Sequence, residues 1–94
     1  MITTILTNAI VTAYIATGNP CADGHYPTVG TTIALPRIYP LGSKVIIGSH
    51  VYIGQDRLNK RWPSNRFDLF FPDLKSAKAW GIHKNMRVTI ITEK

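Results

Sequence analysis

Short runs of β-branched residues, separated every few positions by proline or glycine, constrain the fold of this chain more than any other feature. Residues 31–35 and 51–53 are rich in Val, Ile and Thr, which favour strands. In residues 10–17, side chains alternate between two faces in the manner of a strand. Gly48-Ser49-His50 lies between two such runs and is typical of a hairpin turn. The pattern predicts a small β-barrel or sandwich.

The length and the remaining segments narrow this prediction. A chain of 94 residues corresponds to one domain over residues 1–94, with no internal repeat. Residues 66–71 and 87–92 read as two further strands. Between them, Asp73 can cap a helix that Gly81 ends. We therefore expect a mainly β domain of six or seven strands with one short helix.

The net charge points to anionic partners. Lys and Arg number 11 against 5 acidic residues, which gives a formal charge of +6. A basic surface speeds encounter with anions, and both nucleic acid and the bacterial cell wall are anionic. A basic loop near Trp62 also resembles sites that bind single-stranded nucleic acid, although solvated basic loops are commoner. The basic residues concerned are Arg57, Lys60, Arg61 and Arg66.

Targeting and metal signals are weak. The chain opens without a basic and apolar leader, and its apolar runs are far shorter than the roughly 20 residues of a membrane span. We therefore expect a protein made in the cytoplasm without a signal peptide. One cysteine, Cys21, excludes an internal disulfide. With His25, His50 and His83 it matches no standard zinc spacing, so neither a metal nor a cofactor is expected.

One acidic residue, Asp68, lies inside the aromatic and aliphatic run Phe67-Asp68-Leu69-Phe70-Phe71. A carboxylate in such a run is costly to bury unless it is paired or functional. Asp56 lies twelve residues upstream, across the basic loop. Two acids brought together by a turn are what glycoside cleavage requires. Arg66, two residues before Asp68, shares its strand face and would lower its pKa, so a simple ion pair is the alternative.

Several separated motifs follow one another along the chain. They are Thr12-Ala13-Tyr14, Thr17-Gly18-Asn19-Pro20, Tyr26-Pro27-Thr28-Val29-Gly30, Pro40-Leu41-Gly42-Ser43-Lys44, Asn65-Arg66-Phe67-Asp68-Leu69-Phe70-Phe71-Pro72 and Ala77 through Trp80-Gly81. Together they resemble the three-aspartate (3D) domain, a double-psi β-barrel that is similar to the catalytic core of membrane-bound lytic transglycosylase A. The resemblance extends from about residue 11 to residue 91.

The resemblance implies cleavage of the β-1,4 bond between N-acetylmuramic acid and N-acetylglucosamine, with formation of a 1,6-anhydro end. Asp68 would then be the catalytic acid/base and Asp56 its partner. Tyr14 and Thr17 match groove-lining positions. Tyr52, Trp62 and Arg66 are added as substrate-binding candidates, the first two because aromatic rings stack on sugars. The expected partners are peptidoglycan glycan strands.

The chain departs from the family pattern at two places, which leaves enzymatic activity open. Leu35 stands where the first aspartate of the family falls, and Asp56-Arg57-Leu58-Asn59 replaces Asp-Thr-Gly-Gly. The alternative is a catalytically inactive cell-wall-binding or phage virion structural module of the same fold. Small size and the missing leader favour a phage-encoded protein that reaches the wall by lysis or within a particle, in contact with virion or secretion-machine subunits. Nucleic acid is the less favoured partner.

Overall fold

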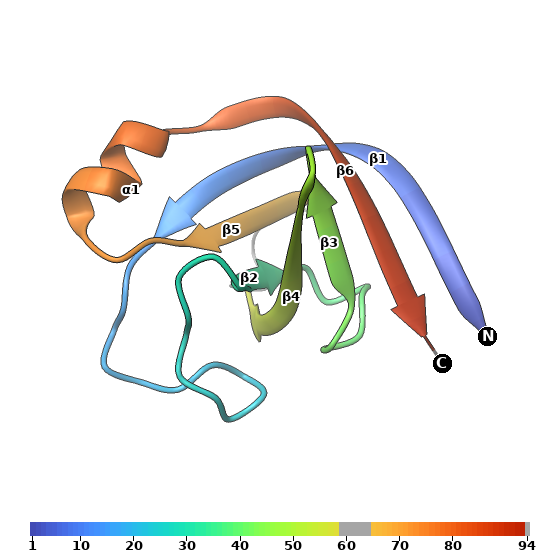
Figure 1. Cartoon of the computed structure of the whole chain (residues 1–94), viewed down its shortest axis with the longest axis horizontal. Coiled ribbons are helices and arrows are strands. Elements are labelled where there is room, and N and C mark those ends of the chain that lie inside the picture. Colours follow the sequence, from blue (N-terminus) through green and yellow to red (C-terminus); the bar gives the residue numbers. More distant parts are fainter. Residues whose placement is uncertain (59–64, 94) are drawn as a thin grey trace.

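The computed structural model describes residues 1–58 and 65–93, which form a closed barrel of six strands and one short helix (Figure 1). This confirms the predicted fold class; the double-psi crossover stays a prediction. The strands are β1 (Ile2–Tyr14), β2 (Thr32–Leu35), β3 (Lys44–Ile47), β4 (His50–Arg57), β5 (Arg66–Phe70) and β6 (His83–Glu93), and the helix is α1 (Leu74–Trp80).

Parallel and antiparallel pairs both occur around the barrel. The strand order is β1-β5-β2-β4-β3-β6, and β6 returns to β1 to close the ring. The pairs β1 with β5 and β2 with β4 are parallel, and the other four are antiparallel. The predicted hairpin is the β3–β4 pair, in which Ile47 lies opposite His50. The parallel pairs β1–β5 and β2–β4, joined by the antiparallel pair β5–β2, bring β1, β5, β2 and β4 side by side.

The first strand is longer than the sequence pattern predicted. It begins at Ile2 rather than residue 10, because residues 2–9 pair with the antiparallel strand β6 from Glu93 back to Met86. The same pairing starts β6 at His83, four residues before the predicted start. At the other end, β1 stops at Tyr14, so Thr17 lies outside it. β1 and β6 run together as a curved ribbon toward the two termini (Figure 1).

The helix follows the predicted capping signals. Asp73 accepts a hydrogen bond from the Ser76 backbone N–H at 2.8 Å, which satisfies one of the free donors of the first turn. Gly81 ends the helix with φ of 71°, a conformation that glycine adopts most easily. The Trp80 indole N–H donates to the Val11 carbonyl at 3.3 Å, which fastens the helix to β1. In the part of the chain described, no helix is long and apolar enough to cross a membrane.

Leu35, the position at which the resemblance placed a missing aspartate, lies in the hydrophobic core. It is fully buried among side chains that line the barrel interior, and it fills the space above Gly54 on β4. A Cβ added to Gly54 would lie 2.5 Å from Leu35 Cγ, too close for any real contact. The core comprises Ala9, Val11, Ile33, Leu35, Tyr39, Val45, Phe67, Leu69, Val88 and Ile90.

Because Leu35 and the Cα of Gly54 adjoin the same space, the stability effects of substituting these two residues should not be additive. Leu35→Ala leaves a cavity and should cost about 2–5 kcal/mol of unfolding free energy. Gly54→Ala overpacks the core and should cost about 1–3 kcal/mol. In the double variant the shortened side chain of the first residue makes room for the methyl group added at the second. The total cost should therefore fall below the sum by about 1 kcal/mol or more. Urea unfolding of the four proteins measures this, and simple additivity would contradict the contact.

Candidate functional site

Four side chains from four adjacent strands form one row across the barrel wall. Thr12 on β1 lies opposite Asp68 on β5, Asp68 lies opposite Ala34 on β2, and Ala34 lies opposite Asp56 on β4. Residues in register on neighbouring strands present their side chains on the same face. The two carboxylates therefore share a face with Ala34 between them, and two strand spacings put their Cα atoms roughly 10 Å apart.

Asp68 is a partly buried carboxyl with a neighbouring cation. Its side chain is 19% exposed, and Arg66 Nε lies 3.7 Å from its Oδ1. Burial raises the pKa of Asp68, while the charge and hydrogen bonding of Arg66 lower it; the net direction is upward. The Thr12 hydroxyl donates to the same Oδ1. The ion pair anticipated from the sequence is present, but it does not outweigh burial.

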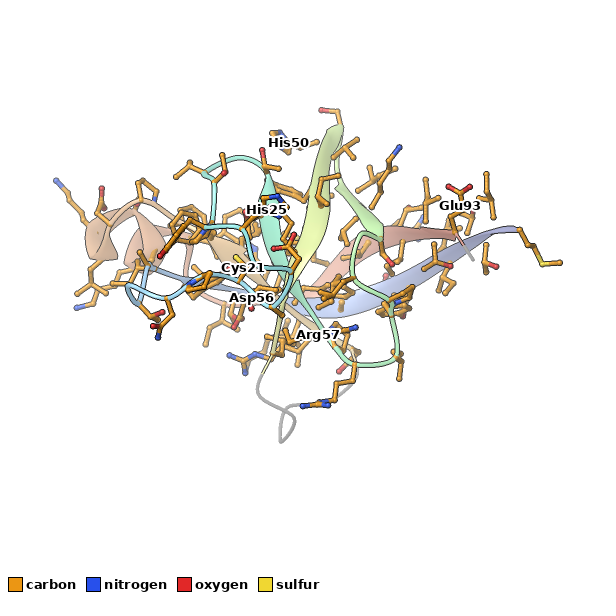
Figure 2. All side chains as sticks on the ribbon, turned by 90° about the horizontal axis from the view of Figure 1, so that it is seen from below. Cys21, His25, His50, Asp56, Arg57 and Glu93 are labelled. Carbon is orange, nitrogen blue, oxygen red and sulfur yellow. The ribbon has the colours of Figure 1, made fainter. Side chains whose placement is uncertain are left out.

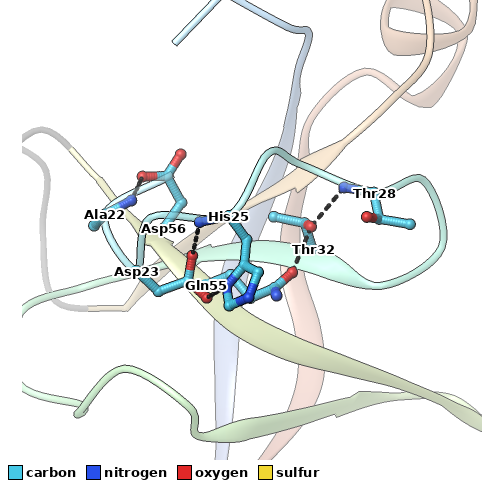
Figure 3. Close-up of polar contacts among 7 residues, drawn as sticks. All are labelled: Ala22, Asp23, His25, Thr28, Thr32, Gln55 and Asp56. Carbon is cyan, nitrogen blue, oxygen red and sulfur yellow. Dashed lines mark hydrogen bonds and ion pairs between the residues drawn. The ribbon is translucent and has the colours of Figure 1, made fainter. Parts of the chain in front are cut away.

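Asp56 holds the loop that follows β1. Its Oδ1 accepts a hydrogen bond from the backbone N–H of Ala22 at 3.1 Å (Figure 3). The same oxygen accepts a second one from the backbone N–H of Arg57 at 2.8 Å. Its Oδ2 accepts a long hydrogen bond from the Tyr14 hydroxyl at 3.5 Å. Asp56 belongs to β4, whereas the sequence pattern placed it after that strand. One oxygen therefore secures the backbone, and the other faces Tyr14.

Tyr14 and Cys21 complete this cluster, and Figure 2 shows Cys21 next to Asp56. Burial raises the pKa of Tyr14 far above its usual range, and the negative charges of Asp56 and Asp68 raise it further. Burial, and then the charge of Asp56, raise the pKa of Cys21 to about 11. Both groups are therefore protonated at neutral pH. The Cys21 thiol is a poor nucleophile, and the Tyr14 hydroxyl is available as a neutral donor.

An aromatic hollow lies beside the row. It has a volume of about 180 Å³ and includes Phe70, which shares the Asp68 face of β5, and Tyr52 on β4. Tyr14 packs edge-on against Phe70 with ring centroids 5.5 Å apart, so Phe70 links the hollow to the carboxylate row. Neither aspartate lines the hollow itself. Its walls are Val29, Gly30, Tyr52, Leu69, Phe70 and Phe71.

The remaining candidates are placed differently. Thr17 is exposed in the segment after β1, where its hydroxyl accepts from the Asn19 N–H at 3.4 Å, and within the described residues no hydrogen bond joins it to either aspartate. Arg57 donates to the carbonyls of Pro36 and Tyr39, so it serves the fold. Trp62, Lys60 and Arg61 lie outside the described residues. Tyr14, Tyr52 and Arg66 are near the row or the hollow, as described above.

Two members of the row were missed by the sequence analysis. Thr12 and Ala34 were not named as site residues, because only strand pairing shows that they flank Asp68. The alternating strand pattern did contain a signal for Thr12, because it places Thr12 on the same face as Tyr14 and on the opposite face from Val11. Among the residues described, no group of three or more His, Cys, Asp or Glu side chains is arranged to hold a metal ion.

The chain is similar to a protein of Bacillus subtilis (strain 168) described as "Putative cell wall shaping protein YabE". The two are 30% identical over 89 residues, which cover 85% of this chain. The chain spans only 21% of the length of that relative. No protein-family model matches the chain, and no solved structure matches it.

The raised pKa of Asp68 predicts a pH-dependent stability. A group whose pKa is raised by folding stabilises the protein below its unfolded value, 3.8, and this stabilisation is lost as pH rises through the folded value. Asp68→Asn removes this titration. The unfolding free energy of the variant, relative to that of the wild type, should therefore increase as the pH rises. Urea unfolding over a pH series measures the difference.

Asp73→Asn is the matched control with the opposite sign. Hydrogen bonds from Ser76 lower the pKa of Asp73. The unfolding free energy of the wild type, relative to that of Asp73→Asn, should therefore increase as the pH rises. Asn also caps helices well, so the fold is preserved. If Asp68→Asn changed with pH in the same direction as Asp73→Asn, the stated environment of Asp68 would be wrong.

Proposed function

We propose that this barrel acts on bacterial peptidoglycan and cleaves glycan strands in the manner of a lytic transglycosylase, with Asp68 as the acid/base. The observation that carries the proposal is a carboxyl with a raised pKa beside an aromatic hollow. An acid of this kind is protonated at a higher pH than an ordinary aspartate, which general acid catalysis requires.

The relationship to a protein named for cell wall shaping supports the choice of substrate. The charge of +6 agrees with it, because wall polymers carry carboxylates and phosphates. The resemblance of the chain to the 3D domain adds the reaction type. The relative supports a role at the cell wall, and the geometry of the site supports the chemistry.

The proposed reaction needs one carboxyl that acts twice. Asp68 first gives its proton to the glycosidic oxygen as the bond from C1 of the muramic residue to that oxygen breaks. The C6 hydroxyl of the same residue then attacks C1 and passes its proton to the Asp68 carboxylate. A 1,6-anhydro end forms, Asp68 regains its proton, and no water is consumed. Asp56, on the same face, would favour positive charge at C1 through space.

The hollow offers a seat for a sugar next to this carboxyl. Phe70 and Tyr52 present aromatic surface there, and sugar rings stack on such surfaces through their C–H groups. Phe70 is two residues from Asp68 on the same strand face. A sugar held against Phe70 would therefore place its linkage near the Asp68 carboxyl.

A second function, glycan binding without cleavage, is favoured by the surroundings of Asp56. Its Oδ1 is engaged by two backbone N–H groups, which indicates a structural role. The side chain between the two aspartates is that of Ala34, so the row carries no third acid. In that case the barrel would hold glycan strands, and Asp68 would contribute a hydrogen bond rather than a proton.

Digestion of purified sacculi separates the two functions. The wild type should release muropeptides with 1,6-anhydro ends, detected by mass spectrometry. Asp68→Asn should lower the release about 100-fold or more, the usual scale of a lost general acid, while it remains folded by circular dichroism. Asp73→Asn changes an exposed aspartate outside the row and should release the product normally.

Binding to sacculi is measured on the same three proteins by co-sedimentation. Retention of the wild type without any anhydro product would support the binding function and exclude the cleavage. Equal release by the wild type and Asp68→Asn would show that this carboxyl is not the acid, whichever residue replaces it in that role.

A further inference from the structure

One hydrogen-bond donor and one positively charged group lie beside the same oxygen of Asp68. The Thr12 hydroxyl donates to Oδ1, and the Arg66 Nε lies 3.7 Å from that atom. A carboxylic acid carries its proton on one oxygen at a time, and the proton avoids the oxygen nearest a positive charge. The arrangement therefore distinguishes the two oxygens of one carboxyl.

In the alternative arrangement, the Thr12 hydroxyl accepts a hydrogen bond from Asp68 instead of donating one. Thr12 Oγ1 also lies 3.5 Å from the Phe67 carbonyl, to which its single proton could turn. Asp68 would then carry its proton on Oδ1 and donate it to Thr12, where no substrate could receive it. The guanidinium of Arg66 beside Oδ1 opposes this state, because it makes a proton on that oxygen less favourable.

We infer that Thr12 is a positioning residue, which holds Oδ1 of Asp68 so that Oδ2 carries the proton that can be exchanged with a ligand. The inference rests on the proposed function for its role in cleavage. The orientation of the Asp68 carboxyl in the free protein follows from the contacts of Asp68 alone.

Thr12 is well built for this role. The parallel register of β1 and β5 sets it directly opposite Asp68, and it is 5% exposed, so water competes little for its hydroxyl. A β-branched side chain has few rotamers within a strand, which limits the positions that its oxygen can occupy. Strand pairing rather than a flexible loop therefore orients the carboxyl.

Carboxyl carbon NMR of the free protein tests the inference by following the titration of Asp68. Thr12→Val keeps the shape of the side chain but removes the donor that favours the ionised form. The ionisation constant of Asp68 should fall about tenfold, which is an upward shift of its pKa. Thr12→Ser restores a hydroxyl and should titrate close to the wild type. Where Thr12→Val fails to fold, Thr12→Ala and Thr12→Ser form the comparison.

Thr32→Val is the matched control. Thr32 is also a buried threonine, but its hydroxyl donates to Gln55 Oε1 at 2.7 Å (Figure 3), so its loss should leave the titration of Asp68 unchanged. An unchanged or lowered pKa of Asp68 in Thr12→Val would overturn the inference. A lowered value would mean that the proton resides on Oδ1.

Sacculus digestion supplies the catalytic readout. In Thr12→Val the release of anhydro product should fall, and the pH at which activity declines should rise with the Asp68 titration; Thr12→Ser should recover both. A wild type that makes no product would refute the proposed function, and the titration would still decide whether Thr12 orients the carboxyl. An altered rate with an unmoved pH profile would contradict the positioning role.

Discussion

The pairing of the short strand β5 between β1 and β2 is the interaction on which the site depends. β5 has five residues, Arg66–Phe70, and both of its edges are hydrogen-bonded, in parallel to β1 and antiparallel to β2. Phe67 and Leu69 therefore point into the core, and Asp68 must point to the other face. A register slip of one residue would bury Asp68 in the core and expose both apolar side chains, at a cost of roughly several kcal/mol.

The balance at Asp68 connects this packing to chemistry. Burial in the barrel wall opposes ionisation of Asp68, whereas Arg66 and Thr12 favour it. The effect of burial is the larger one, so the pKa of Asp68 is raised. A side chain on a flexible loop would be solvated and would titrate near its ordinary value. The same strand pairing that stabilises the barrel thus sustains the unusual electrostatics of the carboxyl.

Much of the fold could be predicted from local patterns. The helix followed from Asp73 and Gly81, whose capping contacts act within a few residues. The β3–β4 hairpin followed from two β-branched runs around a short turn. The ends of β1 could not be predicted in this way, because residues 2–9 are strand only through their pairing with β6. Asp68 was found as a charge in an apolar run, while Thr12 and Ala34 needed the register of distant strands.

The sequence by itself determined a mainly β chain, the positions of its turns and helix caps, its net positive charge and the acid placed among aromatic residues. These are local properties of composition and spacing. Only the tertiary structure decided that Leu35 belongs to the core, that Asp56 secures a loop, and that Thr12, Asp68, Ala34 and Asp56 share one row. The reason is that strand register joins residues separated by tens of positions, and the pairing energy that sets it comes from the whole closed barrel.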